Sequence, residues 1–391
     1  MRYILLLICS FFYTVCFGQI DGDKLQMNKV KDLKVLNSFY FSPEKLVVVN
    51  DSFVYFEKIY NVGEAICRYN LNNGRLYEYM IPDRRYHRLE RLISTPNGVF
   101  ALYVNLSTES KFDFAFRLYY ICGDDLVEVK ELTFRDDSFR EVKDYNLKRE
   151  SAVILSGLYI KDALLSGDRV ICAAHYPTAA IQVTSLSSNN IELYGGENPP
   201  YPDTLTHEER RGGYDEIRLV ENPSDGKKFA LVYLKSVLSL QIISITDDSI
   251  EIISECNIIR RNRNIDVNEI REYVKFIGRD SLTKKPIVDT LEIKSRRGVT
   301  LGDIGTIMVY GVDVVASPKY IYMLNSGKRF MTRNHHSATE LYIADWDGKL
   351  VGHYELEFPV IKLHYDNLKG KLYGIGKPPK QRDMALMEIQ F

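Results

Sequence analysis

Few side chains in this sequence have the types and spacing of known catalytic motifs. There is no Gly-x-Ser-x-Gly, so the nucleophile elbow of serine hydrolases is missing. There is also no P-loop, no dinucleotide-binding fingerprint and no His-Glu-x-x-His zinc motif. His207, Glu208 and Glu209 are adjacent, but no second histidine follows one helical turn later. We therefore interpret these three residues as part of a solvated loop, and expect no metal or cofactor.

Other polar side chains could form a site only if distant parts of the chain bring them together. His335 and His336 are adjacent, but a metal ion would need further ligands from elsewhere. His175 ends an apolar run, and a structural role is the simpler interpretation. The residues that could converge on an acid–base or metal-dependent site are Glu90, Asp215, Glu216, Asp313 and His364.

One long segment has the composition of a contact surface. Residues 194–214 read YGGENPPYPDTLTHEERRGGY and are rich in glycine, proline and tyrosine. Long loops in compact domains are often functional, and tyrosine is enriched at binding interfaces. The candidate partner-contact residues of this segment are Tyr194, Tyr201 and Tyr214.

The charge of the chain does not favour nucleic acid. It has 51 basic and 52 acidic side chains, a formal net charge of −1, so there is no overall positive field. A local basic cluster could contact an acidic partner or phosphate groups; its residues are Arg260, Arg261 and Arg263. Acidic residues follow it closely, so a solvated loop is the alternative. We expect no nucleic-acid partner.

Five segments repeat one pattern, two alternating apolar runs around a polar turn. LYIADWDGKL, at residues 341–350, is one of them. Period-two alternation is typical of strands with one buried face, and Asn-Gly or Asp-Gly turns suit tight hairpins. The turns are centred at Asn73, Asp124, Asn189, Asp248 and Asp347. The sequence therefore predicts five β-hairpins. We interpret Trp346, within the last of them, as a core or turn-packing residue.

A second strand–turn–strand element precedes four of these hairpins, and a similar element lies near the C-terminus. The five elements cover residues 91–104, 158–174, 217–234, 312–325 and 360–376. Together with the hairpins they form units of about four strands that recur at roughly 40 to 60 residues. This repeat predicts an all-β fold, a β-propeller of four-stranded antiparallel blades.

The spacing of the units predicts six blades and one insertion. The last two turn centres are 99 residues apart (347 − 248), which we interpret as one repeat plus an insertion at about 257–305. A degenerate seventh blade is the alternative. The C-terminal unit shows only three strands, and we expect residues 34–41 to supply the fourth. Strands from both ends would then close the ring and remove exposed sheet edges.

The first 18 residues are typical of a secretory signal peptide. Arg2 precedes an apolar run, and Cys16, Phe17 and Gly18 form a small-x-small cleavage pattern. The run is short for a transmembrane helix, which needs about twenty residues. An uncleaved anchor and a lipid on Cys16 or Cys9 are less favoured alternatives. We predict a mature chain of residues 19–391 that forms a single propeller domain without a transmembrane span.

The sequence resembles the TolB-like six-bladed β-propeller family of exported bacterial proteins. The resemblance rests on the signal peptide followed by Gln19, and on the segments SPKYIYMLN, ELYIADWDGKLVGHYEL and NLKGKLYGIGKPPKQRDMALMEIQF. It covers most of the mature chain and implies a propeller in the periplasm or cell envelope. It carries no catalytic residues over to this chain.

Two functions of different class follow from these patterns. The preferred one is a binding or scaffolding module for an envelope protein, a peptide or a glycan, because no catalytic motif is visible. The alternative is an enzyme with a site at the mouth of the propeller channel, such as a metal-dependent lactonase or a glycan-cleaving enzyme. The alternative would need the acidic and histidine residues named above to converge, and a fold alone does not decide between the two.

Overall fold

The structure is a computed structural model that describes most of the predicted strands. The described residues are 24–38, 45–49, 52–60, 63–80, 87–95, 98–105, 114–134, 160–174, 181–188, 191–194, 217–234, 238–246, 249–259, 273–279, 286–291, 308–329 and 336–391.

Four sheets have four antiparallel strands each, in the order of the sequence. We call them units 1 to 4. Unit 1 is β2 (Leu46–Val49), β3 (Phe53–Tyr60), β4 (Gly63–Asn70) and β5 (Leu76–Met80). Unit 2 is β6 (His87–Thr95), β7 (Gly98–Asn105), β8 (Phe114–Cys122) and β9 (Asp125–Phe134). Unit 3 is β10 (Ile160–Ser166), β11 (Arg169–Ala174), β12 (Ile181–Ser185) and β13 (Ile191–Tyr194). Unit 4 is β14 (Ile217–Asn222), β15 (Asp225–Tyr233), β16 (Leu238–Ile245) and β17 (Ile250–Ile259).

A seven-stranded sheet contains two further units that share one long strand. It consists of β20 (Met308–Ala316), β21 (Tyr320–Arg329), β22 (Ala338–Asp345), β23 (Leu350–Asp366), β24 (Lys371–Gly376), β25 (Ala385–Gln390) and β1 (Lys24–Asp32). The first part of β23 pairs mainly with β22, and its last part, from Val360, pairs with β24. Unit 5 is therefore β20, β21, β22 and the first part of β23. Unit 6 is the last part of β23, then β24, β25 and β1.

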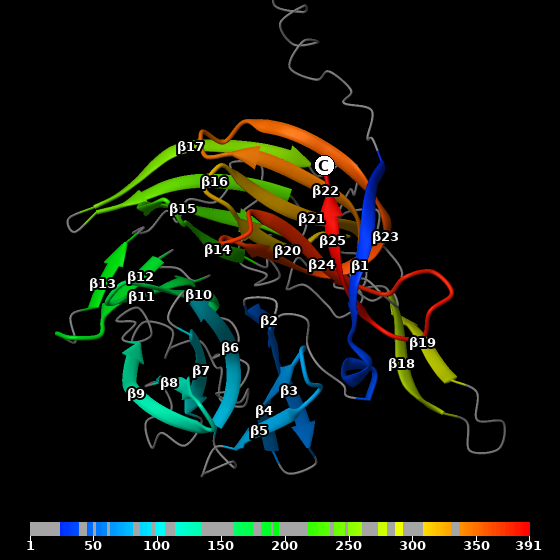
Figure 1. The fold of residues 1–391 in the computed structure, drawn as a ribbon, viewed down its shortest axis with the longest axis horizontal. Coiled ribbons are helices and arrows are strands. Elements are labelled where there is room, and N and C mark those ends of the chain that lie inside the picture. The colour runs from blue at the N-terminus through cyan, green and yellow to red at the C-terminus, as the bar shows by residue number, and fades with distance from the viewer. Residues whose placement is uncertain are drawn as a thin grey trace, which may run out of the picture.

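The first strands of the units form a ring. β2 contacts β6, β6 contacts β10, β10 contacts β14, β14 contacts β20, β20 contacts β23, and β23 contacts β2. Figure 1 shows the units following one another around the molecule in the same order. The fold is a β-propeller. These contacts agree with the predicted six blades; the blade number itself stays a prediction, with seven as the alternative.

Apolar layers between successive units hold the ring together. One cluster joins units 1 and 2 through residues such as Ile66 and Tyr103. Others join units 3 and 4, 4 and 5, 5 and 6, and 6 and 1. Burial of apolar surface is worth about 25 cal/mol per Å², so these layers are the main stabilising contacts between the sheets.

The predicted hairpins and strand–turn–strand elements are confirmed. All five hairpins occur as antiparallel pairs: β4–β5, β8–β9, β12–β13, β16–β17 and β22–β23. Trp346 is buried in the turn region after β22, as predicted, and its indole N–H donates to the Ser317 carbonyl oxygen at 3.0 Å.

Strands from both chain ends close the ring as predicted, but the predicted position of the N-terminal strand, residues 34–41, is wrong. β1, at Lys24–Asp32, pairs antiparallel with β25, whereas residues 34–38 form a 3-10 helix, η1 (Lys34–Ser38). Leu33 and Leu36 are both buried, and their spacing of three matches the period of a 3-10 helix. The remaining residues of the predicted strand, 39–41, lie outside the described part.

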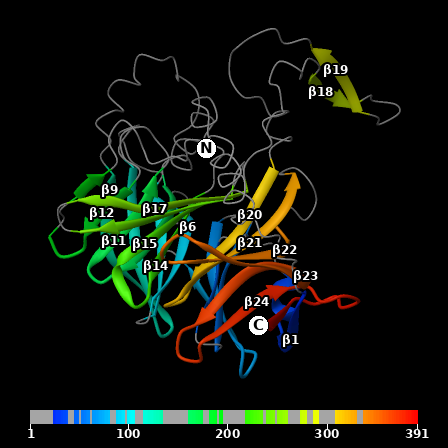
Figure 2. The ribbon, with the colours of Figure 1, turned by 90° about the horizontal axis from the view of Figure 1, so that it is seen from above.

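The predicted insertion contains a separate hairpin. β18 (Tyr273–Arg279) and β19 (Pro286–Leu291) form a two-stranded sheet that pairs with no other described strand. Figure 2 shows this hairpin apart from the other described strands. Because β17 extends to Ile259, the first residues of the predicted insertion belong to unit 4. An insertion, rather than a seventh blade, remains the preferred interpretation. Among the described residues, no helix has the length and apolar character needed to cross a membrane.

Arg68 of unit 1 binds the β8–β9 turn of unit 2. Its Nη1 donates to the Gly123 carbonyl oxygen at 2.6 Å, and its Nη2 lies 2.9 Å from Asp124 Oδ1. The guanidinium also lies 4.5 Å from the centre of the Tyr77 ring and 5.6 Å from that of Tyr79. Cation–π contacts of this kind add to the ion pair.

We expect Arg68→Ala to lower the free energy of unfolding by about 1 to 3 kcal/mol, since it removes a charge-assisted hydrogen bond together with the ring contacts. Urea denaturation measures the change. Arg68→Lys should recover only part of it, because an ammonium cannot form the bidentate contact. A lysine variant as stable as the wild type would show that the planar geometry is unimportant.

Candidate functional site

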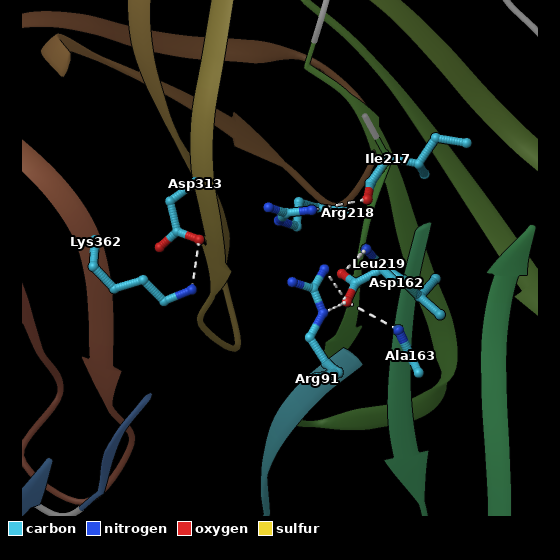
Figure 3. Close-up of polar contacts among 8 residues, drawn as sticks. All are labelled: Arg91, Asp162, Ala163, Ile217, Arg218, Leu219, Asp313 and Lys362. Atoms are coloured by element: carbon cyan, nitrogen blue, oxygen red, sulfur yellow. Dashed lines mark hydrogen bonds and ion pairs between the residues drawn. The ribbon is translucent and has the colours of Figure 1, made fainter. Parts of the chain in front are cut away.

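In each unit, one charged side chain lies in the first strand or immediately before it, beside apolar residues of that strand. The six residues are Lys45, Arg91, Asp162, Arg218, Asp313 and Lys362. In four units this residue directly follows, or lies within, an irregularity in strand register. A β-bulge re-aims the side chains beside it. Figure 3 shows five of the six pointing into a common space between the first strands.

Asp162 joins three units through both of its oxygens. Arg91 Nε of unit 2 donates to Asp162 Oδ1 at 2.5 Å, and Arg91 Nη2 lies 2.5 Å from the same oxygen. The backbone N–H of Ala163 also donates to Oδ1, at 2.9 Å. Asp162 Oδ2 accepts the backbone N–H of Leu219, on β14 of unit 4, at 2.8 Å. Both Arg91 and Asp162 are buried, so these contacts compensate charges that water does not reach.

Asp313 of unit 5 makes similar contacts, but both of them are to unit 6. Lys362 Nζ of unit 6 donates to Asp313 Oδ1 at 2.9 Å. The backbone N–H of Leu363 donates to Asp313 Oδ2 at 2.8 Å. Asp313 is 2% exposed. As with Asp162, one oxygen holds a cation and the other holds the backbone of the next first strand.

The charges alternate over five of the six positions. Arg218 of unit 4 comes between Asp162 and Asp313 in the order of the units, and its Nη1 donates to the Ile217 carbonyl oxygen at 3.3 Å. At the sixth position, Lys45 pairs with Glu57 of β3 at 2.6 Å. The alternation favours attraction between neighbouring units over repulsion.

This arrangement stabilises the ring and leaves the two inner carboxylates engaged. Every oxygen of Asp162 and Asp313 accepts at least one hydrogen bond from a protein donor, so both carboxylates are used to join neighbouring units. Within the described ranges, no group of three or more histidine, cysteine, aspartate or glutamate residues is arranged to hold a metal ion. The chemistry that the geometry supports directly is the joining of blades.

The structure brings only one predicted enzyme-site residue, Asp313, into this cluster. Glu90 lies in the β6 irregularity beside Arg91, and the His364 ring stacks on Tyr373 of β24 with 6.1 Å between ring centres. His336 lies in the turn before β22. The other predicted enzyme, metal or loop residues lie outside the described residues: His175, His207, Glu208, Glu209, Asp215, Glu216 and His335.

The predicted partner-contact residues are almost all outside the described part. Tyr194 is the last residue of β13, where its backbone pairs with Ile181. The five others are Tyr201, Tyr214, Arg260, Arg261 and Arg263.

Five of the six charged residues were missed from the sequence: Lys45, Arg91, Asp162, Arg218 and Lys362. The signal was a charged residue directly before an apolar stretch of the strand, as Arg91 in LERLIST and Asp162 in IKDALLS. This signal becomes visible only when the same position is compared in the first strands of all units. The four described cysteines are free: Cys67 and Cys172 are buried, Cys256 is partly buried and Cys122 is exposed.

Comparisons with known proteins show likeness in structure only. No family model matches the sequence, and no curated protein matches it by sequence. Raptor from Chaetomium thermophilum is similar over 95% of this chain at 9% identity and a TM-score of 0.44, and this chain spans 29% of the Raptor chain. Mala s 1, the major allergen of Malassezia sympodialis, is 12% identical with a TM-score of 0.45, covering 94% of this chain and 96% of Mala s 1.

A third similar structure is XC5397 from Xanthomonas campestris, which is described as a gluconolactonase. It is 7% identical with a TM-score of 0.44, covering 94% of this chain and 90% of XC5397. At these identities and TM-scores, the three likenesses carry no argument about activity.

Proposed function

We propose that this protein is an exported β-propeller, similar to the TolB-like family, that acts as a binding or scaffolding module in the periplasm or cell envelope. The observation that supports the proposal is that Asp162 and Asp313 each accept a backbone N–H of the next unit and so join neighbouring units. A ring joined in this way is a stable frame from which loops can contact a partner.

The two proposed functions make different predictions about the carboxylates of the first strands, Asp162 and Asp313. A lactonase or glycan-cleaving site in the channel would use carboxylates of the first strands to hold a metal ion or to move a proton. Asp313 was one of the first-strand carboxylates predicted for that role, and each of its oxygens accepts a hydrogen bond, one from Lys362 and one from Leu363. This favours the binding module.

The partner would be an envelope protein, a peptide or a glycan. The predicted contact residues are the tyrosines of the 194–214 segment, and the basic cluster at 260–263 is the second candidate. Export rests on the predicted signal peptide, and the envelope location rests on it and on the family resemblance. No cofactor and no nucleic acid take part in this function.

Photo-crosslinking in the native host tests the proposal. A photo-reactive amino acid replaces Tyr201 in one variant and Val127, an exposed residue of β9, in the control variant. We expect one saturable adduct from position 201 that is absent from position 127. Changing Tyr194 and Tyr214 to serine should abolish it in a chain that still unfolds cooperatively. Equal labelling from both positions, or no adduct from either, would contradict the proposal.

A further inference from the structure

Two glutamates of unit 1 share the sheet face that packs against unit 2. Glu57 on β3 lies opposite Ile66 of β4, and Glu64 on β4 lies opposite Ile59 of β3. Residues two positions apart on a strand point to the same face, so the two glutamates are diagonal cross-strand neighbours within side-chain reach. Ile66 belongs to the apolar cluster between the two units.

The surroundings of this pair contain one cation and a hydroxyl without a hydrogen bond. Lys45 Nζ lies 2.6 Å from Glu57 Oε1, and Glu57 is 1% exposed. Glu64 Oε2 accepts the backbone N–H of Leu89, on β6 of unit 2, at 2.8 Å. Tyr103 on β7 is 1% exposed, and its hydroxyl has no hydrogen-bond partner.

The charge balance of this joint favours an additional proton. Two carboxylates face one ammonium, and burial opposes an uncompensated negative charge. When two carboxyl groups share a site, one of them keeps its proton to a higher pH than an isolated carboxyl does. We propose that Glu57 and Glu64 form a proton-binding pair at the joint of units 1 and 2, and that release of the proton weakens this joint.

The electrostatics of the surrounding groups agree with this assignment. Burial is the largest effect on Glu57 and raises its pKa to about 7, while Lys45 lowers the pKa and Glu64 raises it. The two glutamates in turn raise the pKa of Tyr103, after burial, and Tyr119 adds to this effect. Lys45, Glu64, Tyr103 and Tyr119 are thus the titratable groups that act on the pair or on its hydroxyl neighbour.

The sign of the pH dependence follows from the raised pKa. The folded protein holds the proton more tightly than the unfolded chain, whose glutamate titrates near 4.5. The stabilisation is fully present below that value and is lost as the pH rises through about 7. The difference between 4.5 and about 7 corresponds to a change of roughly 300-fold in the folding equilibrium constant.

Thermal unfolding from pH 5 to pH 8 tests the pair, with Glu57→Gln as the main variant and Glu78→Gln as the control. Glu78 pairs with Lys58 at the same distance of 2.6 Å in the same unit, but it is more exposed. We expect the melting temperature of the wild type to fall towards pH 8. Glu57→Gln should flatten that fall and Glu78→Gln should keep it. Equal slopes in all three proteins would overturn the proposal.

A direct titration keeps the test decisive if Glu57→Gln does not fold. Carbon-13 NMR of glutamate carboxyls should show a resonance with a midpoint near pH 7 in the wild type and in Glu78→Gln. It should be displaced to lower pH in Glu64→Gln, because the second carboxylate is gone. A wild type in which every glutamate titrates near pH 4.5 would rule out the pair. Neither measurement depends on the proposed binding function.

Discussion

Replacing Asp162 by alanine is expected to lower the free energy of unfolding by about 3 to 5 kcal/mol. Removing one partner of a buried ion pair leaves the other charge buried without compensation. Here Arg91 would lose its carboxylate, and the backbone N–H of Leu219 would lose its acceptor. Urea denaturation followed by tryptophan fluorescence measures the change, because Trp346 is the only tryptophan in the chain and is buried.

The control for this experiment is Asp32→Ala. Asp32 forms an exposed pair with Lys29 at 3.1 Å, with side chains 40% and 42% exposed. Surface pairs of this kind contribute about 0 to 1 kcal/mol. Combining Asp162→Ala with Arg91→Met should recover part of the lost stability, since the uncompensated charge is then absent. If Asp162→Ala cost no more than Asp32→Ala, the aspartate would not be a tie between units.

Removing strand β1 is expected to have the second large effect. In a chain that starts at residue 33, β25 would lose its outer partner and would become the edge strand of the sheet in place of β1. Leu25 and Met27 are both buried, and each side chain contributes about 1.5 to 3 kcal/mol. Their sum is a large share of the 5 to 15 kcal/mol that typically stabilises a folded protein. We expect a much lower urea midpoint and association through the β25 edge.

Adding the missing strand as a peptide tests whether the effect comes from ring closure. A peptide of residues 24–32 should pair with β25 and raise the urea midpoint of the shortened chain, as donated strands do in other sheets. The matched control is the same peptide with Leu25→Asp and Met27→Asp, which should have no effect. Equal stability of the shortened and full chains would contradict closure by β1.

The hairpins could be predicted because their signals are local. A tight turn needs residues that tolerate positive φ, and Gly74, Gly123 and Gly348 adopt such values after β4, β8 and β22. Alternating burial along a strand can also be read from neighbouring residues, as in β22. Composition and turn chemistry therefore sufficed for the units and their order.

The closing strand was harder to predict because it is an outer strand. Only Leu25 and Met27 of its nine residues are buried, and three of the others are lysines. Such a strand has little apolar alternation, and its pairing with β25 bridges more than 350 positions in sequence. Residues 34–41, the predicted strand, contain more apolar residues than β1.

The charged cluster could not be predicted in full because convergence is a tertiary property. Asp162 and Asp313 are far apart in sequence and play the same role only because the ring places each beside the next first strand. The Glu57–Glu64 pair depends likewise on strand register and on contact with unit 2. Residue type alone does not distinguish a carboxylate that joins two units from one that binds a metal ion or a substrate. Asp313 was therefore also a candidate for an enzyme site.

Metal analysis most directly tests the claim that the inner carboxylates join blades. The protein is purified from its host without chelators, and divalent ions are measured by mass spectrometry in the wild type and in Asp313→Asn. We expect no stoichiometric divalent ion in either protein, and a lower urea midpoint in Asp313→Asn because Lys362 loses its charged partner. One ion per chain in the wild type, lost in Asp313→Asn, would contradict the structural role and support an enzyme with a metal in its channel.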